Sequence, residues 1–115
     1  MRRRLFQYPL LRADIADALR YTERKWGEVK KAEYKALIKE AKDALRENPF
    51  VARPRPDIHP EARLYRIAKP GRDAAHAFLY VVTPDENVIL VRFLNEARDL
   101  PRHFPKDYDQ GLSRE

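Results

Sequence analysis

The sequence contains no cysteine and only three glycines among its 115 residues. Without cysteine the chain can form neither a disulfide framework nor a thiolate zinc site. The glycines, Gly27, Gly71 and Gly111, stand too far apart to form a Gly-rich phosphate loop, and no Gly-x-Ser-x-Gly elbow occurs. These absences exclude nucleotide binding through such a loop and serine hydrolysis through such an elbow.

Long apolar runs are also missing, because no stretch approaches the roughly 20 residues that a membrane-spanning helix needs. The basic start of the chain is broken by Pro9 too early to resemble the apolar segment of a secretory signal. We therefore expect a soluble cytoplasmic protein with no membrane association. A chain of 115 residues suits one domain, which at this size buries enough apolar surface to fold without disulfides or metal.

The three histidines give no sign of a metal site. His59, His76 and His103 lie far apart in the sequence, and none of them has the helical spacing of a metal-binding pair. We expect neither a metal ion nor a cofactor.

Positive charge is present in excess and is unevenly distributed. The net charge is +6. Residues 1–12 contain four arginines and no acid, and residues 49–73 contain six lysines or arginines against three acids. Such patches favour a polyanion or an acidic protein partner, by an attraction that weakens as salt rises. A solvated basic surface explains the charge equally well.

The first half of the chain has the periodicity of one strand and two helices. Residues 3–8 alternate as a short strand, and Pro9 suits the first turn of a helix. Apolar residues recur at three- and four-residue spacings over residues 10–26 and again over residues 28–47. Gly27 separates the two stretches and fits a helix terminus, so we expect an antiparallel helical hairpin.

The second half begins with a proline-rich connector and ends in strands. Four prolines between residues 49 and 60 predict an ordered, extended connector, which Phe50, Val51 and Ile58 would attach to the body. A strand is expected over residues 63–69, followed by a turn at residues 70–73. Two runs rich in Val, Ile, Phe and Tyr within residues 75–101, separated by a turn at Pro84 and Asp85, predict a β-hairpin.

We expect an α+β fold, in which the elements follow the order β-α-α-β-β-β. A small antiparallel sheet would carry the helical hairpin on one face, because the apolar stripes of the helices need a flat apolar surface to cover. The β-hairpin of residues 75–101 is then the core. Residues 1–104 form the single domain, a helical turn follows over residues 96–100, and residues 105–115 are expected to fray.

The polar residues of the expected strands allow either catalysis or a structural role. Ribonuclease chemistry without metal needs a base, an acid and cations for the phosphorane, and the candidates are Arg66, Lys69, His76 and Arg92, with Tyr80 as an alternative to His76. Solvated or salt-bridged strand residues are the simpler explanation. Asp99 and Arg98 could likewise form a scaffold with Arg92 or Arg102 at the end of the sheet.

Five stretches in order resemble one known family. They are YPLLRADI, YTERKWG, AEYKALIKEAKDALRENP, ARPRPDI and ILVRFLNEARDLPRHF. They are similar to the ParE-type toxins of the ParE/RelE toxin-antitoxin superfamily, and the resemblance covers about residues 3–104. The resemblance implies the same order of elements, with a small sheet backed by a helical hairpin.

The resemblance also implies a function and partners. A ParE-type protein is the toxin of a type II pair, associated with plasmid stabilization, and a cognate ParD-like antitoxin holds it inactive with a C-terminal segment that lies along the toxin. ParE-type members block DNA gyrase, whereas RelE-type relatives cut messenger RNA in the ribosome. RelE-type nucleases rely on a C-terminal Tyr or His-Tyr pair, but here His103 is followed by Phe104, which cannot transfer a proton. We therefore favour a gyrase inhibitor over a nuclease.

Two alternatives remain open, namely a ribosome-dependent endoribonuclease and an inactive relative that only binds its antitoxin. One departure concerns the target contacts, because Asn95, Glu96 and Ala97 stand where the family often has His-Gly-Arg. The antitoxin segment is expected to combine apolar anchors with acidic residues. The residues expected to bind partner or target are Arg3, Arg4, Arg66, Arg92, Asn95, Arg98, Asp99 and Arg102.

Overall fold

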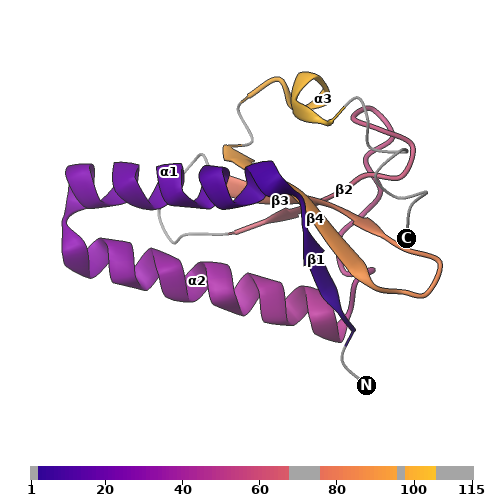
Figure 1. Cartoon of the computed structure of the whole chain (residues 1–115), viewed down its shortest axis with the longest axis horizontal. Helices are drawn as coiled ribbons and strands as arrows, with labels where there is room; N and C mark the ends of the chain where they lie inside the picture. Colours follow the sequence, from indigo (N-terminus) through magenta and orange to yellow (C-terminus); the bar gives the residue numbers. More distant parts are fainter. Residues whose placement is uncertain (1–2, 68–75, 96–97, 106–115) are drawn as a thin grey trace.

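Two long helices pack against a four-stranded sheet in the computed structural model, which describes residues 3–67, 76–95 and 98–105 (Figure 1). The elements are β1 (Leu5–Gln7), α1 (Pro9–Trp26), α2 (Glu28–Glu47), β2 (Arg63–Arg66), β3 (His76–Val82), β4 (Val88–Asn95) and α3 (Leu100–His103). This order confirms the expected α+β fold. The turn expected at residues 70–73 lies outside the described residues, as does the tail from residue 106 onward.

Local chemistry explains where α1 begins and where the chain turns from α1 into α2. Pro9 occupies the first turn of α1, where a backbone N–H would have no intrahelical acceptor. Gly27 separates α1 from α2 with a φ of 93°, a backbone conformation that side chains disfavour, and its N–H donates to the Glu23 carbonyl at 2.8 Å. The two helices are therefore joined by a single residue and run antiparallel, as Figure 1 shows.

The sheet is mixed, and the expectation of a purely antiparallel sheet was wrong. The strand order is β1-β4-β3-β2, and β2, β3 and β4 pair antiparallel. β1 instead pairs parallel with β4, with Leu5 opposite Val88 and Gln7 opposite Leu90. Parallel pairing requires a long connection between the two strands, and the helical pair, β2 and β3 supply it.

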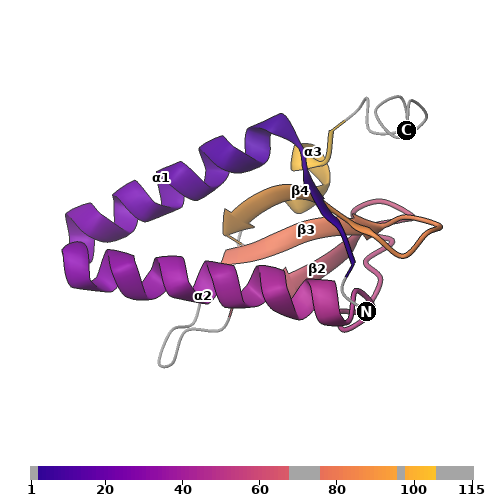
Figure 2. The ribbon, with the colours of Figure 1, turned by 60° about the horizontal axis from the view of Figure 1, so that its bottom comes forward.

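Both faces of the β3–β4 hairpin are buried, which explains its nearly continuous apolar runs. One face packs against the helical pair; its buried members include Leu11, Tyr34, Ile38, Leu45, Phe78 and Phe93. A second, smaller core covers the opposite face; its members are Ile58, Ala62, Leu79, Val81, Ile89, Val91, Leu94, Leu100 and Phe104. The connector and α3 therefore complete the layer that the sequence prediction left uncovered (Figure 2).

The connector is anchored differently from the sequence prediction. Ile58 is buried as expected, but Phe50 and Val51 are 48% and 49% exposed. The segment folds back on itself instead of remaining extended, because the Arg55 N–H donates to the Ala62 carbonyl at 2.8 Å. Of the helical turn expected over residues 96–100, residues 96 and 97 lie outside the described residues; the described helix α3 begins at Leu100, with Pro101 in its first turn, where proline is well tolerated.

Neither α1 nor α2 is apolar enough to cross a membrane, and the same holds for every helix in the described part of the chain.

Candidate functional site

A polar pocket of about 460 Å³ opens between α1 and the last residues of β4. It forms where β1 ends, because β1 pairs only with residues 88–90 and leaves the remainder of β4 without a neighbouring strand on that side. The pocket is lined by Asp14, Asp17, Ala18 and Tyr21 of α1, by His76 of β3, by Arg92, Phe93, Leu94 and Asn95 of β4, and by Arg98.

The centre of the pocket wall is an ion pair between Asp14 and Arg92. The Arg92 Nε donates to Asp14 Oδ2 at 2.7 Å, and Arg92 Nη2 donates to Asp14 Oδ1 at 2.9 Å. The same carboxylate accepts the Phe93 backbone N–H at 3.0 Å, which satisfies the edge of β4 beyond β1. The Arg92 side chain is 15% exposed and the Asp14 side chain is 9% exposed, so water screens the charges of the pair little.

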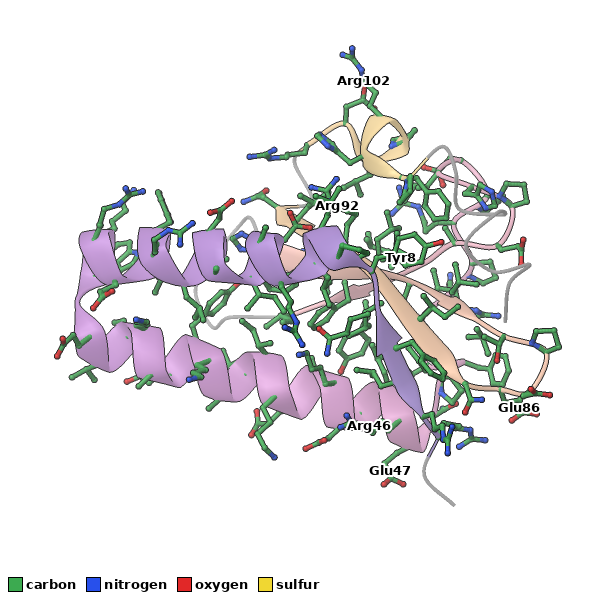
Figure 3. The ribbon with its side chains drawn as sticks, viewed as in Figure 1. Tyr8, Arg46, Glu47, Glu86, Arg92 and Arg102 are labelled. Atoms are coloured by element: carbon green, nitrogen blue, oxygen red, sulfur yellow. The ribbon has the colours of Figure 1, made fainter. Side chains whose placement is uncertain are left out.

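Arg92 also contacts α3. Its Nη1 donates to the His103 carbonyl at 3.3 Å, and Figure 3 shows the side chain between α1 and α3. An irregularity in the β3–β4 register at Leu79/Tyr80 leaves Val91 as an extra residue, and such a bulge redirects neighbouring side chains. The hydrogen bond that Arg92 donates to the Asp14 carboxylate raises the pKa of Arg92 above its ordinary value. Arg92 is thus a permanent cation that fastens two helices to the sheet.

His76 is held between aromatic rings. Its imidazole stacks on Phe93 with the centroids 5.1 Å apart and meets Tyr34 edge-on at 5.7 Å. Burial lowers the pKa of His76 below its ordinary value, and the nearby Arg98 lowers it further, although Asp14 opposes both. The ring is therefore neutral at neutral pH, and it packs against Phe93 and Tyr34.

Replacing His76 with phenylalanine is expected to reduce the pH dependence of stability. The folded-state pKa is lowered, so the unfolded chain binds the proton more readily, and wild-type stability falls as the pH drops below about 6.5 toward the folded-state pKa. Each pKa unit of difference contributes about 1.4 kcal/mol. Urea unfolding at pH 5 and pH 7.5 measures the effect. The same change in unfolding free energy between the two pH values in wild type and His76→Phe would contradict the prediction. His103→Gln serves as the matched control.

The eight residues expected to bind a partner occupy separate places. Arg92, Asn95 and Arg98 line the pocket. Asp99 and Arg102 follow, exposed, with 4.0 Å between the Asp99 Oδ2 and the Arg102 Nε, and the Arg102 side chain points away from the body (Figure 3).

The remaining three lie elsewhere. Arg3 joins the chain start to two segments, since its Nη1 donates to the Glu47 carbonyl at 2.8 Å and its Nη2 contacts Glu86 at 3.0 Å. Arg4 is its exposed neighbour, and Arg66 lies on β2 at the opposite edge of the sheet.

The residues of the ribonuclease hypothesis do not share one face in the described part of the chain. His76 lies on the helical face, whereas strand alternation directs Arg66 to the face opposite Tyr65 and Ile67, which pack against the helical core. Lys69 lies outside the described residues. Tyr80, the alternative acid or base, donates its hydroxyl hydrogen to the Pro49 carbonyl at 2.8 Å, and burial raises its pKa to about 12.

The scaffold expected at the end of the sheet exists with a different partner. Asp99 lies 4.0 Å from Arg102, at the distance limit of an ion pair, but Arg92 is bound by Asp14 of α1, which the sequence interpretation did not pair with it. The sequence contained a signal for the Asp14–Arg92 pair. Arg92 is the only charged residue within the apolar run of β4, and Asp14 borders the apolar stripe of Leu11 and Ala18 on α1. A buried arginine requires a carboxylate partner.

No group of three or more His, Asp or Glu side chains gathers closely enough to hold a metal ion within residues 3–67, 76–95 and 98–105.

A comparison with protein families settles the class of the protein. The family model described as "ParE toxin of type II toxin-antitoxin system, parDE" matches residues 8–100. The chain belongs to the ParE toxin family. The match runs from the start of α1 to the start of α3, so the Asp14–Arg92 pair and the pocket lie within the ParE region. As a ParE-family toxin of a type II system, the protein has an antitoxin as its partner. No curated protein gives a sequence match to the chain.

Proposed function

We propose that this ParE-family toxin inhibits DNA gyrase by direct protein contact and that a ParD-like antitoxin neutralises it. The observation that carries the proposal is the bidentate Asp14–Arg92 pair. Arg92 is the cation best placed on the hairpin to meet a phosphate, yet its guanidinium is already bound by a carboxylate and by the His103 carbonyl. An arginine engaged in this way supports folding better than phosphoryl chemistry.

The remaining groups of the pocket also favour binding over cleavage. A general base needs a pKa near the working pH and access to the proton it removes. Burial lowers the pKa of His76, and the stacking on Phe93 covers one face of its ring. A protein contact needs neither property.

The proposed gyrase contact centres on Arg98 and Arg102, beside the pocket and on α3. Both side chains are exposed, and Arg98 lines the pocket next to Asn95. Exposed arginines beside a concave surface are typical of protein interfaces, where arginine is enriched at energetic hot spots. The antitoxin segment is proposed to lie along the same end of β4, where it would shield these arginines from the target.

Purified toxin is expected to stop gyrase from supercoiling relaxed plasmid, and added antitoxin should restore supercoiling. The double variant Arg98→Glu/Arg102→Glu should require at least about tenfold more protein for the same inhibition, because charge reversal repels an acidic contact surface. Agarose gels of plasmid topoisomers measure the effect. Arg53→Glu, an exposed arginine of the connector, is the matched control and should inhibit like wild type.

Normal supercoiling at excess folded toxin would overturn the gyrase assignment. Cleavage of messenger RNA after brief expression would then identify the nuclease alternative. Unaffected growth during expression would instead identify an inactive relative that only binds its antitoxin.

A further inference from the structure

The turn between α1 and α2 exposes large apolar side chains. It lies at the opposite end of the molecule from the β3–β4 turn, and no other described helix or strand covers it in Figures 1 and 2. Tyr21, Trp26 and Val29 are 49%, 43% and 72% exposed. Exposed apolar side chains that gather in one place mark interaction surfaces, whereas isolated ones do not.

Lys25 connects two aromatic rings at this turn. Its Nζ lies 5.6 Å from the centre of the Tyr21 ring and 5.7 Å from the centre of the Trp26 ring. The same Nζ donates to the Tyr21 hydroxyl at 3.1 Å. Both ring distances fit cation–π contacts, so the ammonium group and the two rings form one cluster. We call Tyr21, Arg24, Lys25 and Trp26 the helical tip.

Positive charge is in excess around the helical tip. Residues 20–31 contain five lysines or arginines against two acids. Three of the five cations form ion pairs, and these pairs are Arg20–Asp17, Lys30–Glu33 and Lys31–Glu23. The described residues provide the other two, Arg24 and Lys25, with no carboxylate partner. An external anion can therefore pair with both.

Exposed rings beside uncompensated cations match the chemistry of single-stranded nucleic acid. A base stacks on an aromatic ring whatever its identity, and Lys or Arg side chains pair with the neighbouring phosphates. A duplex fits less well, because its bases already stack on one another. A flat bilayer also fits less well, because it would press on the whole turn, including the exposed carboxylate of Glu28, whereas a single strand needs only the α1 side.

We propose that the helical tip binds single-stranded DNA. A base stacks on Trp26 or Tyr21, and Arg24 and Lys25 pair with the adjoining phosphates. The only hydroxyl of the helical tip already accepts a hydrogen bond from Lys25, so the tip is not arranged to select RNA through its 2′-hydroxyl. Binding is measured on the toxin without gyrase, so the proposal and the gyrase assignment can fail independently.

Fluorescence of Trp26 tests the proposal directly, because this residue is the only tryptophan of the chain. We expect a thymidine oligonucleotide of about 12 nucleotides to quench the Trp26 emission to saturation through a stacked base, and to bind more weakly as salt rises. Inorganic polyphosphate, which supplies phosphates without bases, should leave the emission unchanged. Lack of quenching by the oligonucleotide at low salt, or equal quenching by polyphosphate, would overturn the proposal.

Two further titrations separate DNA from the competing ligands. A uridine RNA of the same length should bind no more tightly than the DNA, and tighter binding of the RNA would overturn the choice of DNA. Vesicles of anionic phospholipid should not shift the Trp26 emission to the blue. A blue shift on the vesicles without quenching by the DNA would assign the helical tip to a membrane surface and overturn the proposal.

Two variants locate the DNA on the helical tip, with the anisotropy of a labelled oligonucleotide as the readout. Trp26→Ala should weaken binding about tenfold. Arg24→Gln/Lys25→Gln should reduce the slope of log K against log salt by about 1.4, because two phosphate contacts are lost. Tyr21 stays unchanged in both variants, because it also lines the Arg92 pocket.

Phe50→Ala is the matched control for the helical tip. It removes an aromatic ring that is as exposed as those of the helical tip but lies on the connector, so this variant should bind DNA like wild type. Unchanged binding by both tip variants, each shown to be folded by circular dichroism, would overturn the assignment. Equal weakening by Phe50→Ala and Trp26→Ala would overturn it as well.

Discussion

Replacing Arg92 with alanine is expected to lower the free energy of unfolding by about 2–4 kcal/mol, which corresponds to a fall in melting temperature of roughly 10–20 °C. The reason is the carboxylate that remains. Asp14 is 9% exposed, and without Arg92 its charge would stay largely buried, with the Phe93 N–H as its remaining donor among the described residues. The His103 carbonyl would also lose a donor, which weakens the attachment of α3.

A double-mutant cycle separates the pair from its surroundings. Asp14→Asn keeps a side-chain oxygen that can accept the hydrogen bond from the Phe93 N–H. Arg92→Gln keeps a side-chain hydrogen-bond donor at the position of the arginine. The coupling free energy between the two substitutions is expected to be about 1–3 kcal/mol in urea unfolding. A coupling below about 0.5 kcal/mol, or an Arg92→Ala variant as stable as wild type, would show that the pair contributes little.

The Arg92 result affects how loss of toxicity is interpreted. A growth defect that disappears in Arg92→Ala would follow from a destabilised fold and would not identify a target contact. Arg98 and Arg102 are the better probes of the target surface, because both side chains are exposed and neither holds helices together. Stability and inhibition should therefore be measured on the same preparations.

Replacing Leu79 with alanine is expected to cost about 2–5 kcal/mol of unfolding free energy, as much as a comparable deletion on the helical face. Leu79 lies on the second face of the sheet and is 1% exposed, packed in the core that includes Ile58, Leu100 and Phe104. Its truncation would leave a cavity that the surrounding strands cannot close. If that face were open to water, the same substitution would cost well under 1 kcal/mol.

Leu10→Ala provides the matched control for the Leu79 prediction. Leu10 is also a leucine, but its side chain is 53% exposed near the start of α1, so its truncation should change stability by less than about 0.5 kcal/mol. Guanidinium unfolding monitored by circular dichroism measures both variants. Equal effects at the two positions would contradict the two-faced core.

The amino-acid pattern by itself determined most of the local structure. The stripe periodicity and Gly27 defined α1 and α2 to within one residue, and the paired apolar runs defined the β3–β4 hairpin, because these signals come from neighbours in the sequence. The five ordered stretches also indicated the ParE family, which the family comparison confirmed.

Tertiary structure alone decided the contacts between distant segments. The parallel pairing of β1 with β4, the second core under the connector and α3, and the partner of Arg92 all join residues far apart along the chain. Sequence periodicity reports which side of an element is apolar, but it does not report which element covers that side. The register bulge and the end of β1 place Arg92 beside Asp14, 78 residues away, and burial of the pair makes the arginine structural.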